Sequence, residues 1–198
     1  MKKSERWPES EIEPGDVVYE VGAYEGAWVY DIKSSGAIIR AFEPSPDTFK
    51  RLEKNVGNLP QIHLYNFGLG GRNITIPLGS NNTDGASFVK DDEFTVPAKM
   101  VDIADFIGRV FWPGIKIMHI NIEGGEYELI ARLIDTGYID SVEYIMIHWH
   151  DVPPGAMIMR LDIERDLWKT HRPHLHPSNP TWDIWERTRN GLLPQRPD

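Results

Sequence analysis

Short apolar runs alternate with helical patterns over the first two-thirds of the chain. The runs have the length of strands and end at glycine, proline or polar residues, which is typical of strand–helix–strand units around a parallel sheet. The predicted strands cover residues 16–21, 37–42, 62–67, 115–122 and 142–149. The run at 115–122 is apolar on both faces, as a central strand covered by helices on two sides should be.

Helix signals lie between these runs. Ser45 and Pro46 predict an N-cap and a first helical position, and Gly57 predicts the end of that helix. Two further helices are expected from about residue 26 to Gly36 and from residue 125 to Gly137. We therefore predict an α/β fold with a mostly parallel twisted sheet and helices on both of its faces.

The alternation weakens in the middle of the chain. Residues 73–78 predict an edge strand or hairpin arm, and residues 96–101 predict another strand. Asp102 is expected to cap a short helix that runs through Arg109. This stretch does not fit the regular strand–helix alternation, so its place relative to the sheet is left open.

The last quarter of the chain is also irregular. After residue 151 we expect a helix over 158–168, a loop rich in histidine and proline, and an antiparallel edge strand near 181–186. Residues 1–14 read as an N-terminal extension. A chain of 198 residues is long enough for one core of its own, so we expect a single domain over residues 1–198.

Composition narrows the class of protein. The net charge of -9 disfavours nucleic acid as a partner, because an acidic surface repels phosphate backbones. The absence of cysteine excludes disulfides and thiolate chemistry. No apolar run approaches the roughly 20 residues that span a bilayer, and the N-terminus lacks the apolar core of a secretion signal. We expect a cytoplasmic protein that is not bound to a membrane.

The turn after the first predicted strand carries the first chemical signal. Residues 20–26 read Glu-Val-Gly-Ala-Tyr-Glu-Gly, with the spacing Gly-x-x-x-Gly in place of the Gly-x-Gly-x-x-Gly of dinucleotide sites. Glu20 would repel a pyrophosphate but would favour the cationic S-adenosylmethionine. A nicotinamide-dependent oxidoreductase is therefore disfavoured, although a tight strand–helix connection without a ligand would show the same glycines.

Glu43 ends the second predicted strand, about 20 residues after Gly22. A carboxylate at that place accepts hydrogen bonds from both hydroxyls of a ribose in folds of this kind. The alternative is a helix-start carboxylate that is favoured by the helix dipole. Together with the turn, Glu43 favours a nucleoside site.

Five segments in order make the chain resemble the FkbM-type S-adenosylmethionine-dependent methyltransferases, over about residues 17–150. They are residues 20–26, 42–45 (Phe-Glu-Pro-Ser), 66–69 (Asn-Phe-Gly-Leu), 84–87 (Asp-Gly-Ala-Ser) and 121–126 (Asn-Ile-Glu-Gly-Gly-Glu). The resemblance implies a single-domain, Rossmann-like class I methyltransferase fold, with Phe67 near the adenine and with Asn121, Glu123 and Glu126 at the reacting end. The residues expected to bind the cofactor are Glu20, Gly22, Ala23, Tyr24, Gly26, Glu43, Pro44, Ser45, Phe67 and Asn121.

Two positions depart from the family pattern. Asn121 stands where the family usually has aspartate, and His148 stands where an acidic residue is common late in the next strand. If a carboxylate at either place acts as a base in relatives, that role has moved or been lost here. If the role has been lost, the protein would be a non-catalytic module that binds S-adenosylmethionine, and this alternative stays open.

His148 and His150 flank Trp149 and are expected on one face of a strand, at the end that opens toward the cofactor. A neutral imidazole is a good base for a hydroxyl that attacks a methyl sulfonium. Two hydrogen-bonded histidines at the sheet edge are the alternative. A metal ion held with Glu123 would need three converging ligands, and we predict no metal site.

The other candidate side chains are expected to be structural. His119 reads as a core residue in mid-strand, and Trp182 and Trp185 read as packing in preference to a substrate wall. His171, His174 and His176 stand among prolines, where a solvated loop is favoured over a metal site.

The sequence thus predicts a methyltransferase that uses S-adenosylmethionine to O-methylate a hydroxyl of a small molecule or a sugar. The expected catalytic residues are His148, His150, Glu123 and Asn121. The alternatives left open are a metal-assisted methyltransferase, a non-catalytic binding module and an NAD-dependent oxidoreductase.

Overall fold

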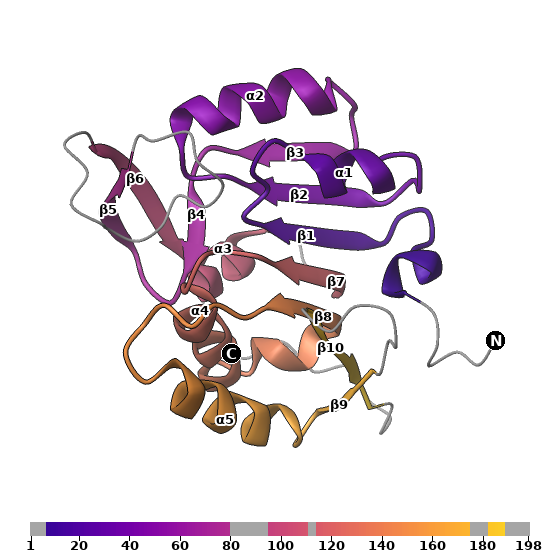
Figure 1. The fold of residues 1–198 in the computed structure, drawn as a ribbon. Coiled ribbons are helices and arrows are strands. Elements are labelled where there is room, and N and C mark those ends of the chain that lie inside the picture. The colour runs from indigo at the N-terminus through magenta and orange to yellow at the C-terminus, as the bar shows by residue number, and fades with distance from the viewer. Residues whose placement is uncertain (1–6, 80–94, 111–113, 175–181, 189–198) are drawn as a thin grey trace.

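The computed structural model describes residues 7–79, 95–110, 114–174 and 182–188. A seven-stranded sheet in the order β3-β2-β1-β7-β8-β10-β9 runs through the molecule (Figure 1). Its parallel strands are β1 (Val17–Val21), β2 (Ile38–Phe42), β3 (Ile62–Tyr65), β7 (Ile115–Ile120) and β8 (Val142–His148). Strand β10 (Trp182–Arg187) pairs antiparallel with β8, and β9 (His171–Pro173) pairs antiparallel with β10. The predicted parallel sheet and its antiparallel edge strand are confirmed.

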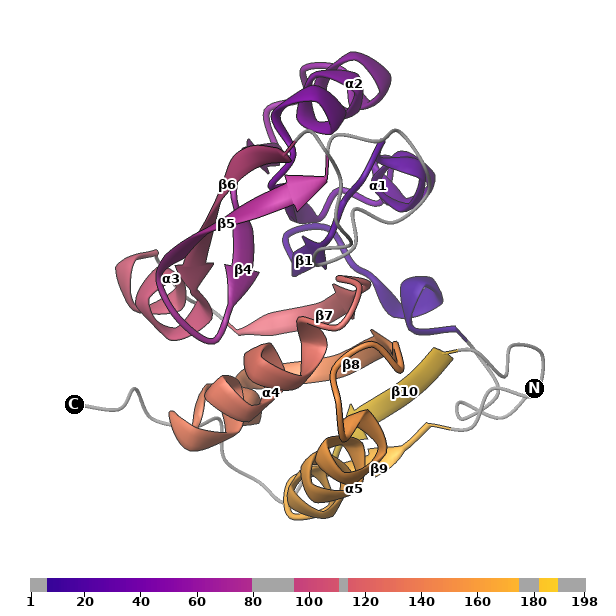
Figure 2. The same cartoon turned by 60° about the vertical axis from the view of Figure 1, so that its left-hand side comes forward.

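Helices cover both faces of this sheet (Figures 1 and 2). The helices α1 (Ala27–Ile32) and α2 (Pro46–Val56) pack on one face, and α3 (Ile103–Arg109), α4 (Glu126–Asp135) and α5 (Ala156–Leu167) pack on the other. Along β1, Tyr19 and Val21 enter the core beneath α3 to α5, whereas Val18 enters the core beneath α1 and α2. Each fully buried apolar side chain of this kind contributes roughly 1.5–3 kcal/mol to stability.

Two helix starts follow the predicted capping chemistry. The Ser45 hydroxyl accepts a hydrogen bond from the backbone N–H of Thr48 at 3.4 Å, and Pro46 begins α2. The Asp102 carboxylate accepts from the N–H of Ala104 at 2.8 Å and begins α3. Each side chain satisfies a donor that the first turn of a helix leaves open.

The irregular middle of the chain forms a second sheet, in the order β4-β6-β5. Strands β5 (Ile74–Gly79) and β6 (Thr95–Asp102) are the two predicted there, and they pair antiparallel. The third strand, β4 (Gly68–Gly70), was not predicted, because a Gly-Leu-Gly segment shows no alternation. Since β4 follows β3 after two residues, this sheet stands beside the carboxyl end of β3 (Figure 1). The motif at residues 84–87 lies outside the described residues.

The predicted solvated loop around residue 171 is wrong for two of its three histidines. His171 lies in the short strand β9, is 0% exposed, and its Nε2 lies 3.0 Å from the carbonyl oxygen of Val142. His174 is buried too, with Nδ1 3.2 Å from a carboxylate oxygen of Glu186. Three residues that include a proline give no periodic signal. The segment forms a strand because it pairs with β10, and the two histidines are buried there while the other two side chains of β9 stay exposed. His176 lies outside the described residues.

The part of the predicted N-terminal extension that is described packs against the domain. A single 3-10 turn (Pro8–Glu11) lies beside α1, and the Trp28 indole N–H donates to a Glu9 carboxylate oxygen at 2.9 Å. Trp7 and Ile12 pack against the core beneath α1 and α2. Within the described ranges, no helix is both long enough and apolar enough to cross a bilayer.

Candidate cofactor and active site

The loops that follow β1, β2, β7 and β8 meet at one edge, because parallel strands present their carboxyl ends together. Gly22 lies where the first of these loops touches the third. Its φ is +86°, and a Cβ on it would lie 2.1 Å from the carbonyl oxygen of Asn121. A glycine is therefore required for the two loops to approach each other this closely.

Glu43 joins the loops after β1 and β2. One carboxylate oxygen accepts from the backbone N–H of Tyr24 at 3.0 Å, and the other accepts from the N–H of Ser45 at 2.8 Å. Burial raises the pKa of Glu43 to about 7, although the two backbone hydrogen bonds oppose this shift. Since each carboxylate oxygen can accept more than one hydrogen bond, the group keeps acceptor capacity for a ligand.

Aromatic side chains form a wall next to these loops. Phe67 lies 5.4 Å from Tyr65 and 5.8 Å from Phe42 between ring centroids, and Phe106 closes the cluster from α3. Phe67 is partly buried and packs against the core beneath α3 to α5. It follows β3 directly, so it belongs to the same edge as Glu43.

Two other predicted cofactor residues have protein partners. The carboxylate of Glu20 is buried, and one of its oxygens lies 2.6 Å from Nδ1 of His119. Burial raises the pKa of Glu20, while the nearby His119 acts in the opposite direction. A Cβ on Gly26 would lie 2.6 Å from the side chains of Leu52 and Val56, so Gly26 faces α2. Contact of Glu20 and Gly26 with the cofactor stays a prediction.

His119 is buried, as expected of a core residue, and its ring lies between two indoles. The ring centroids of Trp28 and Trp182 are each 4.4 Å from it. Trp182 also lies 5.2 Å from the ring of His148, and Trp185 is buried against Trp168. Both tryptophans of β10 therefore pack against rings of the protein, as predicted.

The turn after β7 brings three polar side chains to the edge. Asn121 donates its backbone N–H to Val21, and its side-chain Oδ1 is buried without a hydrogen-bond partner among the described residues. Glu123 has a positive φ of 51°, which is uncommon for a residue with a side chain. Glu126 begins α4 and is fully buried at 0% exposure.

Glu126 ties this turn to the end of β8. One carboxylate oxygen accepts from the backbone N–H of His150 at 2.8 Å and lies 3.3 Å from Nδ1 of the same ring. The other oxygen accepts from the N–H of Gly124 at 2.9 Å. The carboxylate thus fixes both the backbone and the ring of His150.

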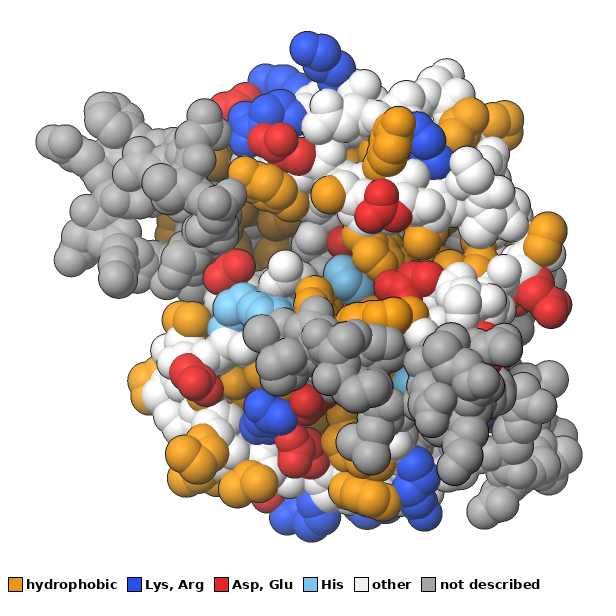
Figure 3. Space-filling model, turned by 45° about the vertical axis from the view of Figure 1, so that its right-hand side comes forward, with side chains coloured by type: hydrophobic (Ala, Val, Ile, Leu, Met, Phe, Trp, Pro, Cys, Tyr) orange, Lys and Arg blue, Asp and Glu red, His pale blue; other side chains and the backbone are white. Residues whose placement is uncertain are grey.

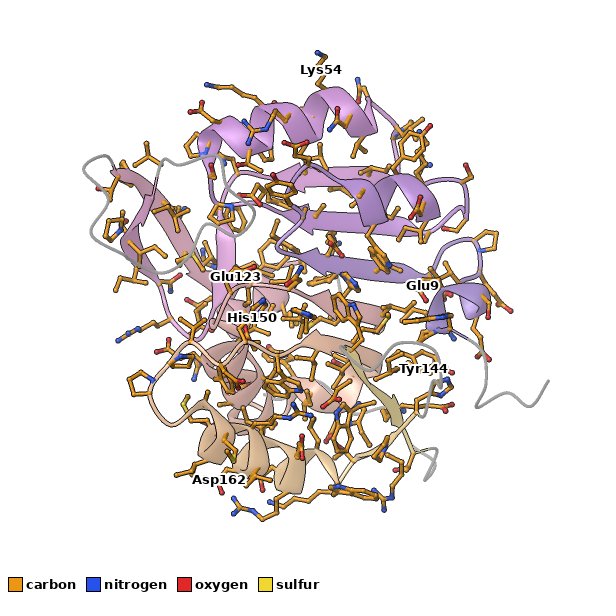
Figure 4. The ribbon with its side chains drawn as sticks, viewed as in Figure 1. Glu9, Lys54, Glu123, Tyr144, His150 and Asp162 are labelled. Atoms are coloured by element: carbon orange, nitrogen blue, oxygen red, sulfur yellow. The ribbon has the colours of Figure 1, made fainter. Side chains whose placement is uncertain are left out.

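His148 and His150 lie in contact, with 3.1 Å between Nδ1 of His148 and Nε2 of His150. A carboxylate oxygen of Glu123 is 3.4 Å from the same Nε2, and Figure 4 shows Glu123 and His150 side by side near the ends of β7 and β8. Histidine side chains also gather in the middle of the face shown in Figure 3, beside a hollow. The two imidazoles lie together, as predicted, but β8 ends at His148, so His150 lies just beyond the strand and not on its face.

The pKa values of the two rings are shifted in opposite directions. Burial lowers the pKa of His148 and the adjacent His150 lowers it further, which together outweigh the opposing effect of the Glu123 and Glu126 carboxylates. The hydrogen bond with Glu126 raises the pKa of His150, and this effect outweighs its burial. Two titratable groups with pKa values pushed apart are typical of acid–base sites. In the described part of the chain, no three His, Asp or Glu side chains are arranged to hold a metal ion.

Sequence reasoning missed two contacts of this site. The resemblance placed Glu126 at the reacting end, but it gave no sign that Glu126 holds His150, 24 residues further along the chain. It also gave no sign that Trp28 and Trp182 enclose His119. Partners so far apart in sequence leave no local pattern.

Comparison with known proteins identifies the family of this chain. The FkbM methyltransferase domain matches residues 20–167. Hexuronic acid methyltransferase AglP of Haloferax volcanii is 27% identical to this chain over 146 residues. The match covers 71% of this chain and 58% of AglP, so this chain spans a little more than half the length of that relative. The crystal structure of a protein assigned as an rRNA methylase from Clostridium thermocellum superposes with a TM-score of 0.54 at 8% identity, over 91% of this chain and 90% of that one, and shows the shared fold. The chain belongs to the FkbM methyltransferase family.

Proposed function

We propose that the protein transfers a methyl group from S-adenosylmethionine to a hydroxyl oxygen of a small molecule or sugar. The observation that carries this proposal is the Glu43 carboxylate, which is held by two backbone amides at the carboxyl edge of the sheet. It lies where a ribose would be recognised, next to a glycine turn that lacks the phosphate-binding spacing.

The residues at this edge fit the cofactor. Glu43 would accept hydrogen bonds from the ribose hydroxyls, and Phe67 would lie against the adenine. The buried Oδ1 of Asn121 has no partner among the described residues and would accept from the cofactor's amino group. Gly22 would let the cofactor lie close to the backbone. Bound S-adenosylmethionine would supply an electrophilic methyl group on a sulfonium.

The protein's own contribution would be alignment and removal of a proton. Holding two reactants in line can account for about 7–11 kcal/mol of a barrier. His148 is the base that the surroundings favour, because its lowered pKa keeps the imidazole neutral near pH 7. Glu123 and His150 complete the group of residues at the reacting end.

A carbohydrate acid is our first choice of acceptor, because AglP is described as acting on a hexuronic acid. A hexuronic acid offers hydroxyls and a carboxylate, and a neutral base is useful for the hydroxyls alone. The lowered pKa of His148 therefore favours an ether product over an ester. We further propose that residues 1–198 act as one domain, because β9 and β10 extend the sheet from β8.

The test is methyl transfer from labelled S-adenosylmethionine to a hexuronic acid, its methyl glycoside and a neutral sugar. We expect a labelled product that survives mild alkali, as an ether does and an ester does not. Binding of S-adenosylmethionine without transfer to any acceptor would favour the non-catalytic module. Binding of NAD in its place would favour the oxidoreductase, and loss of transfer in chelator would favour the metal-assisted enzyme.

A further inference from the structure

We propose that His148 and His150 form a two-step proton relay, with the buried Glu126 as the positioning residue that fixes its direction. The proposal rests on the proposed function, since it concerns the proton that an acceptor hydroxyl must lose. It assigns a separate role to each of two histidines that the sequence presents as equivalent.

The hydrogen bonds determine which nitrogen is the base. Glu126 accepts backbone N–H bonds on both of its oxygens, so it acts as an acceptor and Nδ1 of His150 carries the hydrogen that faces it. In the neutral ring, Nε2 of His150 then has the lone pair. Because Nδ1 of His148 lies 3.1 Å from that lone pair, Nδ1 carries a hydrogen and Nε2 of His148 is left as the free base.

The direction of transfer follows from the charges around the pair. Two carboxylates face His150, that of Glu126 from α4 and that of Glu123 from the turn after β7. The ring of His148 lies against Trp182 of β10, and it is influenced by His150, by His119 of β7 and by the same two carboxylates, whose effect on its pKa is smaller than that of burial and of His150. These surroundings raise the pKa of His150 and lower that of His148. An added proton is therefore more stable on His150.

The step is balanced in atoms and electrons. The acceptor O–H bond breaks, its electron pair stays on oxygen and forms the bond to the methyl carbon, and its proton binds Nε2 of His148. The hydrogen on Nδ1 of His148 passes to Nε2 of His150, which becomes an imidazolium between Glu123 and Glu126. After the product leaves, solvent removes the hydrogen on Nε2 of His148 and the proton on Nε2 of His150 returns to Nδ1 of His148, which restores the starting tautomers.

The first test needs no turnover. Nitrogen-15 spectra of the free protein, assigned with H148Q and H150Q, report the tautomer and pKa of each ring. We expect the Nδ1-protonated tautomer at His148 and a higher pKa at His150 than at His148. A hydrogen on Nε2 of neutral His148, or the reverse order of pKa values, would overturn the relay.

The second test is the pH profile of E126Q, which replaces the carboxylate by a neutral amide of the same shape. We expect unchanged affinity for S-adenosylmethionine, kcat lowered by about tenfold or more, and an acid limb moved to lower pH, because His150 loses the charge that raises its pKa. The matched control is E128Q on the same helix, where Glu128 is exposed and pairs with Arg72 at 3.6 Å. It should keep the wild-type profile. A profile of E126Q that does not move would overturn the positioning role.

The double variant H148Q/H150Q keeps the proposal falsifiable if E126Q does not fold. Residues that act as one unit are not additive, so we expect the double variant to be about as slow as H148Q. Losses that multiply would contradict a shared path. If the wild type methylates a sugar and H148Q keeps full activity, the relay would be contradicted while the methyltransferase function would stand. That result is expected for a carboxylate acceptor, which needs no base. A wild type that transfers no methyl group would end the proposed function, while the nitrogen spectra would still decide the order of hydrogen bonds.

Discussion

The two halves of the carboxyl edge are built in different ways. On the side of β1 and β2, the main chain holds Glu43 through the amides of Tyr24 and Ser45. On the side of β7 and β8, side chains hold one another: Glu126 contacts the ring of His150, and His150 in turn contacts the ring of His148. A site held by the backbone tolerates changes in neighbouring side chains, whereas a chain of titrating side chains depends on each of its members.

This difference matches the chemistry assigned to the two halves. A cofactor common to many enzymes needs the same contacts each time, and the β1–β2 half supplies them from short local motifs. The acceptor and its proton are specific to one reaction. The β7–β8 half, which we expect to bind them, contains the two residues that depart from the family pattern, Asn121 and His148. The first half therefore indicates the family, and the second should carry the individuality of this protein.

The joint between the halves should be the most sensitive position. Gly22→Ala would place a methyl group 2.1 Å from the Asn121 carbonyl at a φ of +86°, and we expect a cost of about 4 kcal/mol in the free energy of unfolding, from strain and overpacking together. Urea denaturation measures this cost. The matched control is Gly137→Ala, where φ is +74° and ψ is -1° but no atom lies within 4 Å, so it should lose about 1 kcal/mol. Equal losses in both variants would mean that the halves are not closely joined at Gly22.

A change at the end of β8 should damage the reaction and spare the cofactor. For H148Q we expect kcat to fall by about 10²–10⁴, as is typical when a general base is removed. Affinity for S-adenosylmethionine, measured by calorimetry, should stay within about twofold, because His148 is not among the residues that we expect to contact the cofactor. A large loss of cofactor affinity would show that the two halves do not divide the work in this way.

The reverse pattern is expected of Glu43. Replacing it with Ala would remove the carboxylate that we expect to accept two hydrogen bonds from the ribose hydroxyls, and each such bond contributes about 1.5 kcal/mol or more. We expect the dissociation constant of S-adenosylmethionine to rise about a hundredfold or more. The rate at saturating cofactor should change far less. Unchanged affinity in E43A would remove this residue from the site.

The smallest expected effect is a pH dependence of cofactor binding. The pKa of Glu43 is raised to about 7, and the ribose hydroxyls need the ionised carboxylate as their acceptor. Affinity should therefore rise as the pH increases through 7, with a dissociation constant about tenfold higher at pH 6 than at pH 8. The isosteric variant E43Q should show no such slope. A slope that persists in E43Q would assign the titration to another group, such as a histidine of the second half.

The sequence predicted the two halves unequally, for physical reasons. The Ser45 and Asp102 caps act on neighbours within a few residues, so they are visible in short motifs. The glycine turn and Glu43 are visible too, because each stands in a short motif at the end of a predicted strand, although Glu43 also accepts from Tyr24, 19 positions earlier. Strands β4 and β9 are too short to show a period, and β9 forms a strand by pairing with β10. The solvated loop expected at His171 was wrong for that reason.

The contacts of the second half depend on the fold as a whole. His148 and His150 were identified as a pair from their spacing, but the hold of Glu126 on His150 bridges 24 positions. The stack around His119 joins α1, β7 and β10, which are far apart in the chain. Which histidine takes the proton first could be argued only once those distances were known.

Calorimetric titration of the purified protein with S-adenosylmethionine tests the central claim most directly. The claim is that a carboxylate held by main-chain amides, at an edge without a phosphate site, binds this cationic nucleoside. We expect binding of one cofactor per chain. No heat of binding with millimolar cofactor at pH 8, where Glu43 is ionised, would contradict the account.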